Sequence, residues 1–161
     1  MGVEQFSGYE VIRAAMEVEK TGHRFYSDMA QRAVNGTVKE LFAMLAQDEV
    51  EHLQRLMTLG KKYEEGAYFD NEEEFLPYLQ RFQAEEIFPS PESLAGVVSS
   101  PELDKRALDL AIEAEKKFAA YFQTAAENAR EADGKDAFSW LAGEEERHAA
   151  ILKERRQKIA G

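Results

Sequence analysis

The chain has no cysteine among its 161 residues. This absence excludes a disulfide framework, a zinc ribbon, an iron centre with cysteine ligands and any thiol chemistry. A metal bound by this chain must therefore use oxygen and nitrogen ligands. Histidine is also scarce, with only three residues, so the position of each one is informative.

Basic residues and long apolar runs are also limited. Lysine and arginine total 20 against 31 acidic residues, which gives a net charge of −11. Nucleic-acid partners generally need a clustered basic surface, so we expect none. No stretch approaches the roughly 18 apolar residues of a membrane span, and the start MGVEQFSGYE lacks the basic end and apolar run of a leader. We expect a soluble, cytoplasmic protein without a membrane partner.

The length and the apolar fraction of 44% suit one domain covering residues 1–161. Helices are predicted at about 8–34, 38–59, 101–132 and 134–160. Pairs typical of helix N-termini support three of these starts: Ser7 with Glu10, Thr37 with Glu40, and Asp133 with Asp136. The pattern predicts an all-α protein made of two helical hairpins.

Turn and stop residues define the other boundaries. Asn35-Gly36 is the predicted turn of the first hairpin, and Gly60 is the predicted end of its second helix. Ser100-Pro101 is expected to open the third helix, with proline at the first helical position.

Most of the few prolines lie between the hairpins, in residues 61–100. This segment is predicted to be a long crossover with short helical pieces at 75–82 and 91–98. It is also rich in acidic residues. These indicate either a solvated loop or a patch that attracts cations or a basic partner.

The two hairpins are related by an internal repeat. A shift of 96 positions aligns LAQDEVEH (45–52) with LAGEEERH (141–148), and residues 14–26 with 110–122. A repeat that spans two helices without a gap indicates duplication. Two such hairpins predict a four-helix bundle with pseudo-twofold symmetry.

Each predicted helix has a stripe of residues spaced by three and four positions, as in a bundle core. We call these the core stripes. They comprise Ile12, Ala15, Glu19, Gly22, Tyr26 and Met29; Phe42, Leu45, Glu49, His52, Leu56 and Leu59; Leu108, Ala111, Glu115, Phe118, Phe122 and Ala125; and Phe138, Leu141, Glu145, His148 and Leu152. In all four, acidic and histidine residues occupy the middle, with apolar residues on both sides.

Carboxylates that converge in an apolar core repel one another and lose hydration, so they need a cationic partner. Two divalent ions would balance the charge of four carboxylates, and two imidazoles would complete the ligand set. Oxygen and nitrogen ligands of this kind suit iron or manganese better than structural zinc, which prefers a closed tetrahedral set.

The order Glu19, Glu49-x-x-His52, Glu115, Glu145-x-x-His148 resembles the di-iron carboxylate site of the ferritin-like superfamily. The phrases EKTGHRFY and LAQDEVEHLQRL are similar to those of rubrerythrin-related proteins. This resemblance implies a ferritin-like bundle with two iron ions, for which manganese or a mixed pair is an alternative. It also implies that Glu49 and Glu145 bridge the irons, that Glu19, Glu115, His52 and His148 are terminal ligands, and that Tyr26 lies just outside them.

The resemblance implies a non-haem di-iron oxidoreductase that reduces hydrogen peroxide or oxygen. Rubrerythrins with peroxidase activity typically have a further glutamate three residues after the third-helix ligand, where this chain has Phe118. They often carry a cysteine-rich rubredoxin domain as well, so an external donor such as a rubredoxin-type protein is expected here. The resemblance also implies at least a homodimer. A ferroxidase module of an iron-storing assembly and a bundle with a purely structural metal remain alternatives.

Several other polar and aromatic residues lie near the core stripes. Asp48 and Glu144 precede the two site histidines by four positions, a spacing that would also allow each pair to bind a metal. Because Asp48 and Glu144 lie off the core stripes, they are interpreted instead as solvated groups or as neighbours of the ligands. His23 is expected to be partly exposed or to contact a ligand rather than the metal. For Trp140, Tyr121 and Phe122, core packing is favoured over a role in electron transfer. These three aromatic residues lie on the predicted helices of the second hairpin.

Overall fold

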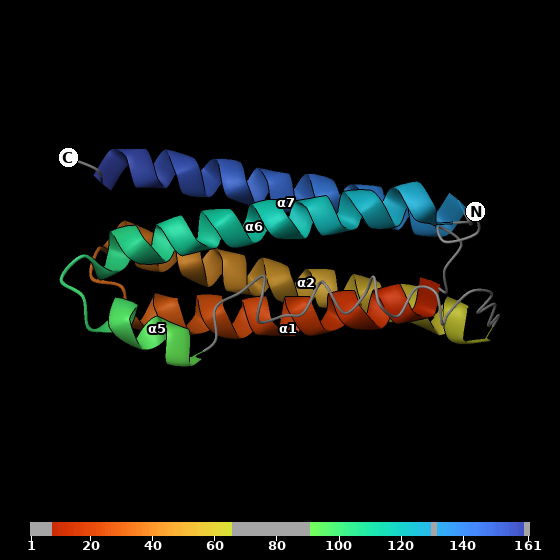
Figure 1. Ribbon diagram of the computed structural model, residues 1–161, viewed down its shortest axis with the longest axis horizontal. Coiled ribbons are helices and arrows are strands. Elements are labelled where there is room, and N and C mark those ends of the chain that lie inside the picture. Colours follow the sequence, from red (N-terminus) through yellow and green to blue (C-terminus); the bar gives the residue numbers. More distant parts are fainter. Residues whose placement is uncertain (1–7, 66–90, 130–131, 160–161) are drawn as a thin grey trace.

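The computed structural model describes residues 8–65, 91–129 and 132–159. This part of the chain forms five helices and no strand: α1 (Gly8–Arg32), α2 (Gly36–Glu65), α5 (Pro91–Val98), α6 (Leu103–Asn128) and α7 (Ala132–Ile159). The four long helices lie side by side along the long axis of the molecule (Figure 1). The predicted all-α, ferritin-like four-helix bundle is confirmed.

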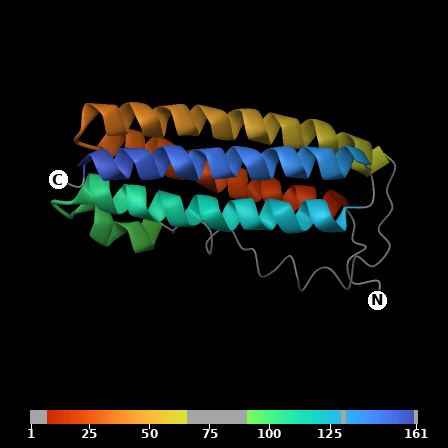
Figure 2. The ribbon, with the colours of Figure 1, turned by 90° about the horizontal axis from the view of Figure 1, so that it is seen from above.

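The bundle consists of two antiparallel hairpins. α1 packs along α2, and α6 packs along α7, while α2 meets α7 and α1 meets α6 to join the two hairpins. Figures 1 and 2 show that α2 ends at one end of the bundle, whereas α6 begins at the other. α2 and α6 therefore run parallel, as expected for two hairpins joined by a long crossover.

The core of the bundle follows the predicted stripes, because every residue of the four stripes is buried. Their apolar members form one hydrophobic cluster that includes Ile12, Phe42, Leu108 and Phe138. Burial of each large apolar side chain stabilises the fold by about 1.5–3 kcal/mol. The polar centre of the stripes is thus held between two apolar regions, which position it and separate it from solvent.

The N-terminus of α2 is capped by a different residue from the one predicted. Asn35 Oδ1 accepts hydrogen bonds from the backbone N–H of Thr37 at 2.9 Å and of Val38 at 3.2 Å, and also from the Thr37 hydroxyl. The predicted capping role of Thr37 is wrong, because its hydroxyl donates to Asn35. The helix accordingly begins at Gly36 rather than near residue 38.

Further boundaries also differ from the prediction, among them the end of α6 at Asn128 rather than near residue 132. α2 continues through Gly60 to Glu65, so the predicted stop at Gly60 is wrong. A Cβ atom at Gly60 would meet Ile12 Cγ2 at 3.4 Å, which shows that the glycine lies at a close approach of α1 and α2. The helix expected to open at Pro101 begins at Leu103, with the N–H of Glu102 donating to Ser100 Oγ at 3.1 Å.

Outside the long helices, the short helical piece expected at 91–98 is confirmed as α5, which buries Leu94 and Val97. The piece expected at 75–82 and the Ser7 cap lie outside the described residues. α7 begins at Ala132 rather than at residue 134, so the predicted cap at Asp133 is wrong, because this residue lies inside the helix. None of the described helices combines the length and apolar character needed to cross a bilayer.

Candidate metal centre

The structure brings together the six polar residues of the core stripes. α1 supplies Glu19, α2 supplies Glu49 and His52, α6 supplies Glu115, and α7 supplies Glu145 and His148. All six side chains are buried, with at most 1% of their surface exposed. In the described part of the chain they are the only fully buried ionisable side chains apart from tyrosines.

These residues form two overlapping groups in which the ligand atoms lie within 4.8 Å of one another. One group contains Glu19, Glu49, His52 and Glu145, and the other contains Glu49, Glu115, Glu145 and His148. Glu49 and Glu145 belong to both groups. The shift of 96 positions exchanges the two groups, so the pseudo-twofold symmetry of the sequence is also present in the site.

The Nδ1 atoms of both histidines face the carboxylates. His52 Nδ1 lies 3.0 Å from Glu19 Oε2 and 2.8 Å from Glu145 Oε1. His148 Nδ1 lies 2.9 Å from Glu115 Oε2. The two imidazole rings stack with their centroids 5.4 Å apart. Each group therefore has one imidazole nitrogen and three carboxylates directed at a common centre.

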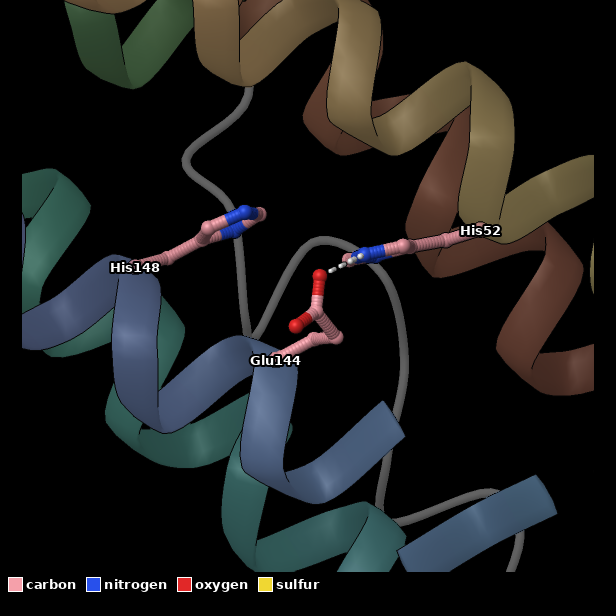
Figure 3. A group of neighbouring side chains, drawn as sticks. All are labelled: His52, Glu144 and His148. Atoms are coloured by element: carbon pink, nitrogen blue, oxygen red, sulfur yellow. Dashed lines mark hydrogen bonds and ion pairs between the residues drawn. The ribbon is translucent and has the colours of Figure 1, made fainter. Parts of the chain in front are cut away.

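The other nitrogen of each ring contacts a carboxylate from the opposite hairpin. His148 Nε2 lies 2.9 Å from Asp48 Oδ2, and His52 Nε2 lies 3.5 Å from Glu144 Oε1. Figure 3 shows Glu144 reaching from α7 toward His52 on α2. A carboxylate that accepts a hydrogen bond from Nε2 fixes the ring orientation and leaves Nδ1 free to bind a metal. Asp48 and Glu144 thus contact the predicted ligands, which agrees with one of the two sequence-based interpretations.

Arg147, which no sequence motif singled out, links these two outer carboxylates. Its Nη2 donates to Asp48 Oδ2 at 3.2 Å and to Glu144 Oε1 at 3.0 Å. Arg147 therefore holds the hydrogen-bond partners of both histidines at once. The only sequence signal for this role is its place next to His148, one turn after Glu144.

Comparison with known families agrees with this arrangement. The sequence model of the rubrerythrin family matches residues 10–156 of the chain. The chain belongs to the rubrerythrin family. No curated protein and no solved structure gives a significant match. Proteins of the rubrerythrin family bind iron and are generally of the oxidoreductase type, and the buried Glu and His groups could hold a metal.

The hydrogen bonds of the site show that its residues fit the metal of the rubrerythrin family. Among the described residues, nearly all buried side-chain polar atoms without a partner in hydrogen-bond geometry belong to this cluster, although short contacts such as that between His52 Nδ1 and Glu19 Oε2 join some of them. They are both carboxylate oxygens of Glu19, Glu49 and Glu145, Glu115 Oε1, His52 Nδ1, and, outside the cluster, Arg155 Nε. An unpaired buried polar atom is costly. Divalent cations bound between these side chains would satisfy the unpaired atoms of the cluster.

The pKa values show the same need for a cation. Burial, together with the charges of neighbouring glutamates, raises the pKa of Glu19, Glu49 and Glu145 well above the ordinary value. Burial acts in the same direction on Glu115, but the contacts of His148 and of the Tyr26 hydroxyl with its Oε2 atom help to outweigh burial and lower its pKa. Without a metal, Glu19, Glu49 and Glu145 therefore hold their protons more tightly than free carboxyl groups, and a divalent cation would displace these protons.

The two histidines titrate differently. Burial and the neighbouring His148 lower the pKa of His52 to about 4. Burial alone would also lower the pKa of His148, but Glu115 and Asp48 outweigh it and raise that pKa. In the metal-free protein at neutral pH, His52 is therefore uncharged and able to offer a lone pair. The shift of His148 runs in the opposite direction and favours its protonated form more than in a free imidazole.

Tyr26 lies where the resemblance to rubrerythrins placed it, next to a predicted ligand. Its hydroxyl donates a hydrogen bond to Glu115 Oε2 at 2.9 Å. Burial and the charge of Glu115 raise the pKa of Tyr26 well above its ordinary value, so the phenol keeps its proton. The repeat equivalent is Phe122, which has no hydroxyl. The two halves of the site are therefore chemically unequal, despite the shared ligand pattern.

The remaining candidates lie away from the centre. His23 Nδ1 is 3.0 Å from the backbone carbonyl of Ala46, and His23 belongs to neither ligand group. This contact ties α1 to α2. Phe118, at the position of the additional rubrerythrin glutamate, is fully buried in the core. Core packing is confirmed for Tyr121 and Phe122.

Proposed function

We propose that this protein is a non-haem di-iron oxidoreductase that reduces hydrogen peroxide or oxygen with electrons from an external donor. The observation that carries the proposal is the pair of overlapping ligand groups that share Glu49 and Glu145. Such sharing lets two bridging carboxylates hold two metal ions close together, which is the arrangement that two-metal oxidation chemistry needs. Membership of the rubrerythrin family supports iron as the metal.

The bound irons would supply reversible one-electron redox chemistry. The protein's part is to hold ligands in fixed positions. Glu19 and His52 would serve one ion, Glu115 and His148 the other, with Glu49 and Glu145 between them. The apolar residues of the stripes exclude bulk water, while Asp48 and Glu144 fix the two imidazoles.

Proton supply and charge balance also follow from the chain's own residues. Reduction of peroxide or oxygen to water consumes protons as well as electrons. The phenol of Tyr26 keeps its proton and directs it at Glu115 Oε2. It can therefore donate a hydrogen bond to this carboxylate or to an oxygen species that approaches it. Between the two oxidants we favour peroxide, on the family relationship. A rubredoxin-type donor, a homodimer and a cytoplasmic location complete the proposal.

The test uses protein loaded anaerobically with two Fe(II) per chain and mixed separately with peroxide and with oxygen in a stopped-flow instrument. We expect rapid oxidation by at least one oxidant, renewed after an added donor reduces the protein again. Stepwise addition of iron should saturate at the loaded stoichiometry. Uptake of many further irons as mineral would favour storage instead. Fe(II) that is inert to both oxidants would indicate a structural metal.

A further inference from the structure

Trp140 on α7 is the only tryptophan of the chain, and its side chain is 40% exposed. Core packing, favoured for this residue from the sequence, is therefore wrong for Trp140. Its indole meets the imidazole of His52 edge to face, with ring centroids 5.6 Å apart and an interplanar angle of 80°. His52 itself is buried, with 1% exposed. The indole therefore spans the distance between solvent and a predicted metal ligand.

The surface around Trp140 keeps the indole accessible. A pocket of about 640 Å³ between α2 and α7 is lined by Trp140, Arg55, Leu59 and Asp136, among others. The guanidinium carbon of Arg55 lies 4.0 Å from the centroid of the indole. This cation–π contact holds the ring in place, and the positive charge disfavours loss of an electron from the indole.

The exposed indole occurs in only one of the two repeated hairpins. The equivalent of Trp140 in the first hairpin is Met44, which is exposed to a similar degree, at 41%. The second hairpin thus carries an aromatic ring where the first carries a thioether. Among the described residues, no other exposed large hydrophobic side chain is aromatic. The ligand symmetry of the site therefore does not extend to its surroundings.

We propose that Trp140 is the group through which electrons from an external one-electron donor reach His52 and, through it, the metal site. This inference rests on the proposed function. In each step the donor loses one electron and one ferric ion at the site becomes ferrous. The indole couples the two partners electronically, without itself being oxidised or reduced overall, and no bond to it forms or breaks.

The first experiment needs no turnover, because Trp140 is the sole tryptophan and reports directly on its surroundings. We expect acrylamide to quench the emission of the full-length protein readily. We also expect Fe(II) to quench that emission strongly as the site fills, whereas Zn(II), which has a closed d shell, should have a much smaller effect. An indole shielded from acrylamide, or equal responses to both metals, would overturn the proposal.

The second experiment separates the two half-reactions in iron-loaded protein. Trp140→Met installs the residue that the repeat carries at Met44. We expect reduction of the oxidised protein by reduced methyl viologen to slow severalfold, while oxidation of the pre-reduced protein by peroxide keeps its rate. Trp140→Phe, which retains a ring beside His52, should recover part of the loss. Met44→Leu is the matched control and should change neither half-reaction.

The outcomes distinguish this inference from the proposed function. If the parent protein is oxidised by peroxide but Trp140→Met is reduced at the parent rate, the electron route through Trp140 is refuted and the function stands. If the parent protein is inert to both oxidants, the function itself fails. Iron content and circular dichroism of each variant show whether a slower reduction reflects lost metal or lost fold, either of which would count against the route.

Discussion

At the scale of single residues, the unequal neighbours of Glu19 and Glu115 are the clearest break in the symmetry of the site. Glu115 Oε2 accepts a hydrogen bond from Tyr26 and lies 2.9 Å from His148 Nδ1. Glu19 Oε2 has the equivalent contact with His52 Nδ1, at 3.0 Å, but neither of its oxygens accepts a hydrogen bond from a hydroxyl, since the repeat equivalent of Tyr26 is Phe122. Because only one half of the site has this hydroxyl, we expect the two metal positions to differ in affinity.

The role of Tyr26 can be tested by Tyr26→Phe, which removes only the hydroxyl. Loss of a buried hydrogen bond to a carboxylate should lower the free energy of unfolding of the metal-free protein by about 1–2 kcal/mol. The metal content should stay at the parent value, since the Tyr26 hydroxyl keeps its proton and donates to Glu115 instead of facing a metal as a phenolate. Urea unfolding and metal analysis check the two expectations. A variant that loses a metal ion would make Tyr26 a ligand.

The acidic run GEEER provides a second test, because its three glutamates face different surroundings. Glu145 is fully buried and shared by both ligand groups, Glu144 contacts His52, and Glu146 accepts a hydrogen bond from Gln123 at the surface. Glu145→Ala should abolish at least one metal position. Glu144→Ala should keep both positions but weaken affinity by about 10–100-fold. Glu146→Ala is the matched control.

Metal titrations followed by absorption and by metal analysis distinguish these variants. Equal losses for Glu144→Ala and Glu145→Ala would contradict the helix face assigned to the ligands. Full metal affinity in Glu144→Ala would show that the contact with His52 Nε2 has no influence on metal binding.

At the scale of helices, the capping of α2 makes a prediction that separates two neighbouring residues. Asn35→Ala removes the acceptor for the N–H groups of Thr37 and Val38, so it should cost about 1 kcal/mol of stability. Thr37→Ala removes only a hydroxyl that donates to Asn35, so its effect should be smaller. Thermal or urea unfolding of both variants provides the measurement. A larger loss for Thr37→Ala would restore Thr37 as the cap.

The sequence predicts the long helices and the six polar core residues because both depend on one signal, the spacing of three and four within a helix. Helix ends are less predictable, since they depend on contacts between helices. Gly60 has the composition of a stop, yet α2 passes through it beside Ile12. The Asn35 cap was obscured because Thr37 with Glu40 matches a capping box equally well.

The surroundings of the ligands depend on how the two hairpins meet, which no spacing within one helix reveals. Asp48 pairs with His148 and Glu144 pairs with His52, so each pair crosses from one hairpin to the other. Arg147 joins both pairs. Likewise, Trp140 reaches the surface because of its position beside α2. These contacts depend on α2 and α7 lying side by side, which the spacing within either helix does not determine.

At the scale of the whole molecule, the bundle buries at its centre the groups that most oppose its folding. Four carboxyl groups and two imidazoles occupy positions where a core would otherwise hold leucine, and apolar residues on both sides hold them together. Burying charged groups without a partner destabilises a fold by several kcal/mol. Stability of the bundle and metal binding are therefore coupled, because filling the site satisfies the groups that oppose folding.

This coupling predicts opposite effects of pH on the metal-free and the metal-loaded protein. Glu19, Glu49, Glu145 and His148 have raised pKa values in the folded state. The folded protein thus binds more protons than the unfolded chain, and stability falls as pH rises. His52 and Glu115 act in the opposite direction, but His52 does so only between its folded pKa of about 4 and its ordinary value of 6.5, and Glu115 only below its ordinary pKa of 4.5. Above the ordinary value of His52, only the destabilising effect remains.

We therefore expect the melting temperature of chelator-treated protein to fall as the pH is raised from neutral toward about 8. Protein loaded with Fe(II) under argon should keep or increase its melting temperature over the same range, because metal binding releases protons and strengthens with pH. Glu49→Gln removes one titrating group and should flatten the slope of the metal-free protein. Differential scanning calorimetry checks all three. A metal-free protein whose melting temperature rises over this range would mean that the carboxylates are already ionised and paired in the folded state, and the buried cluster would then need no metal to be stable.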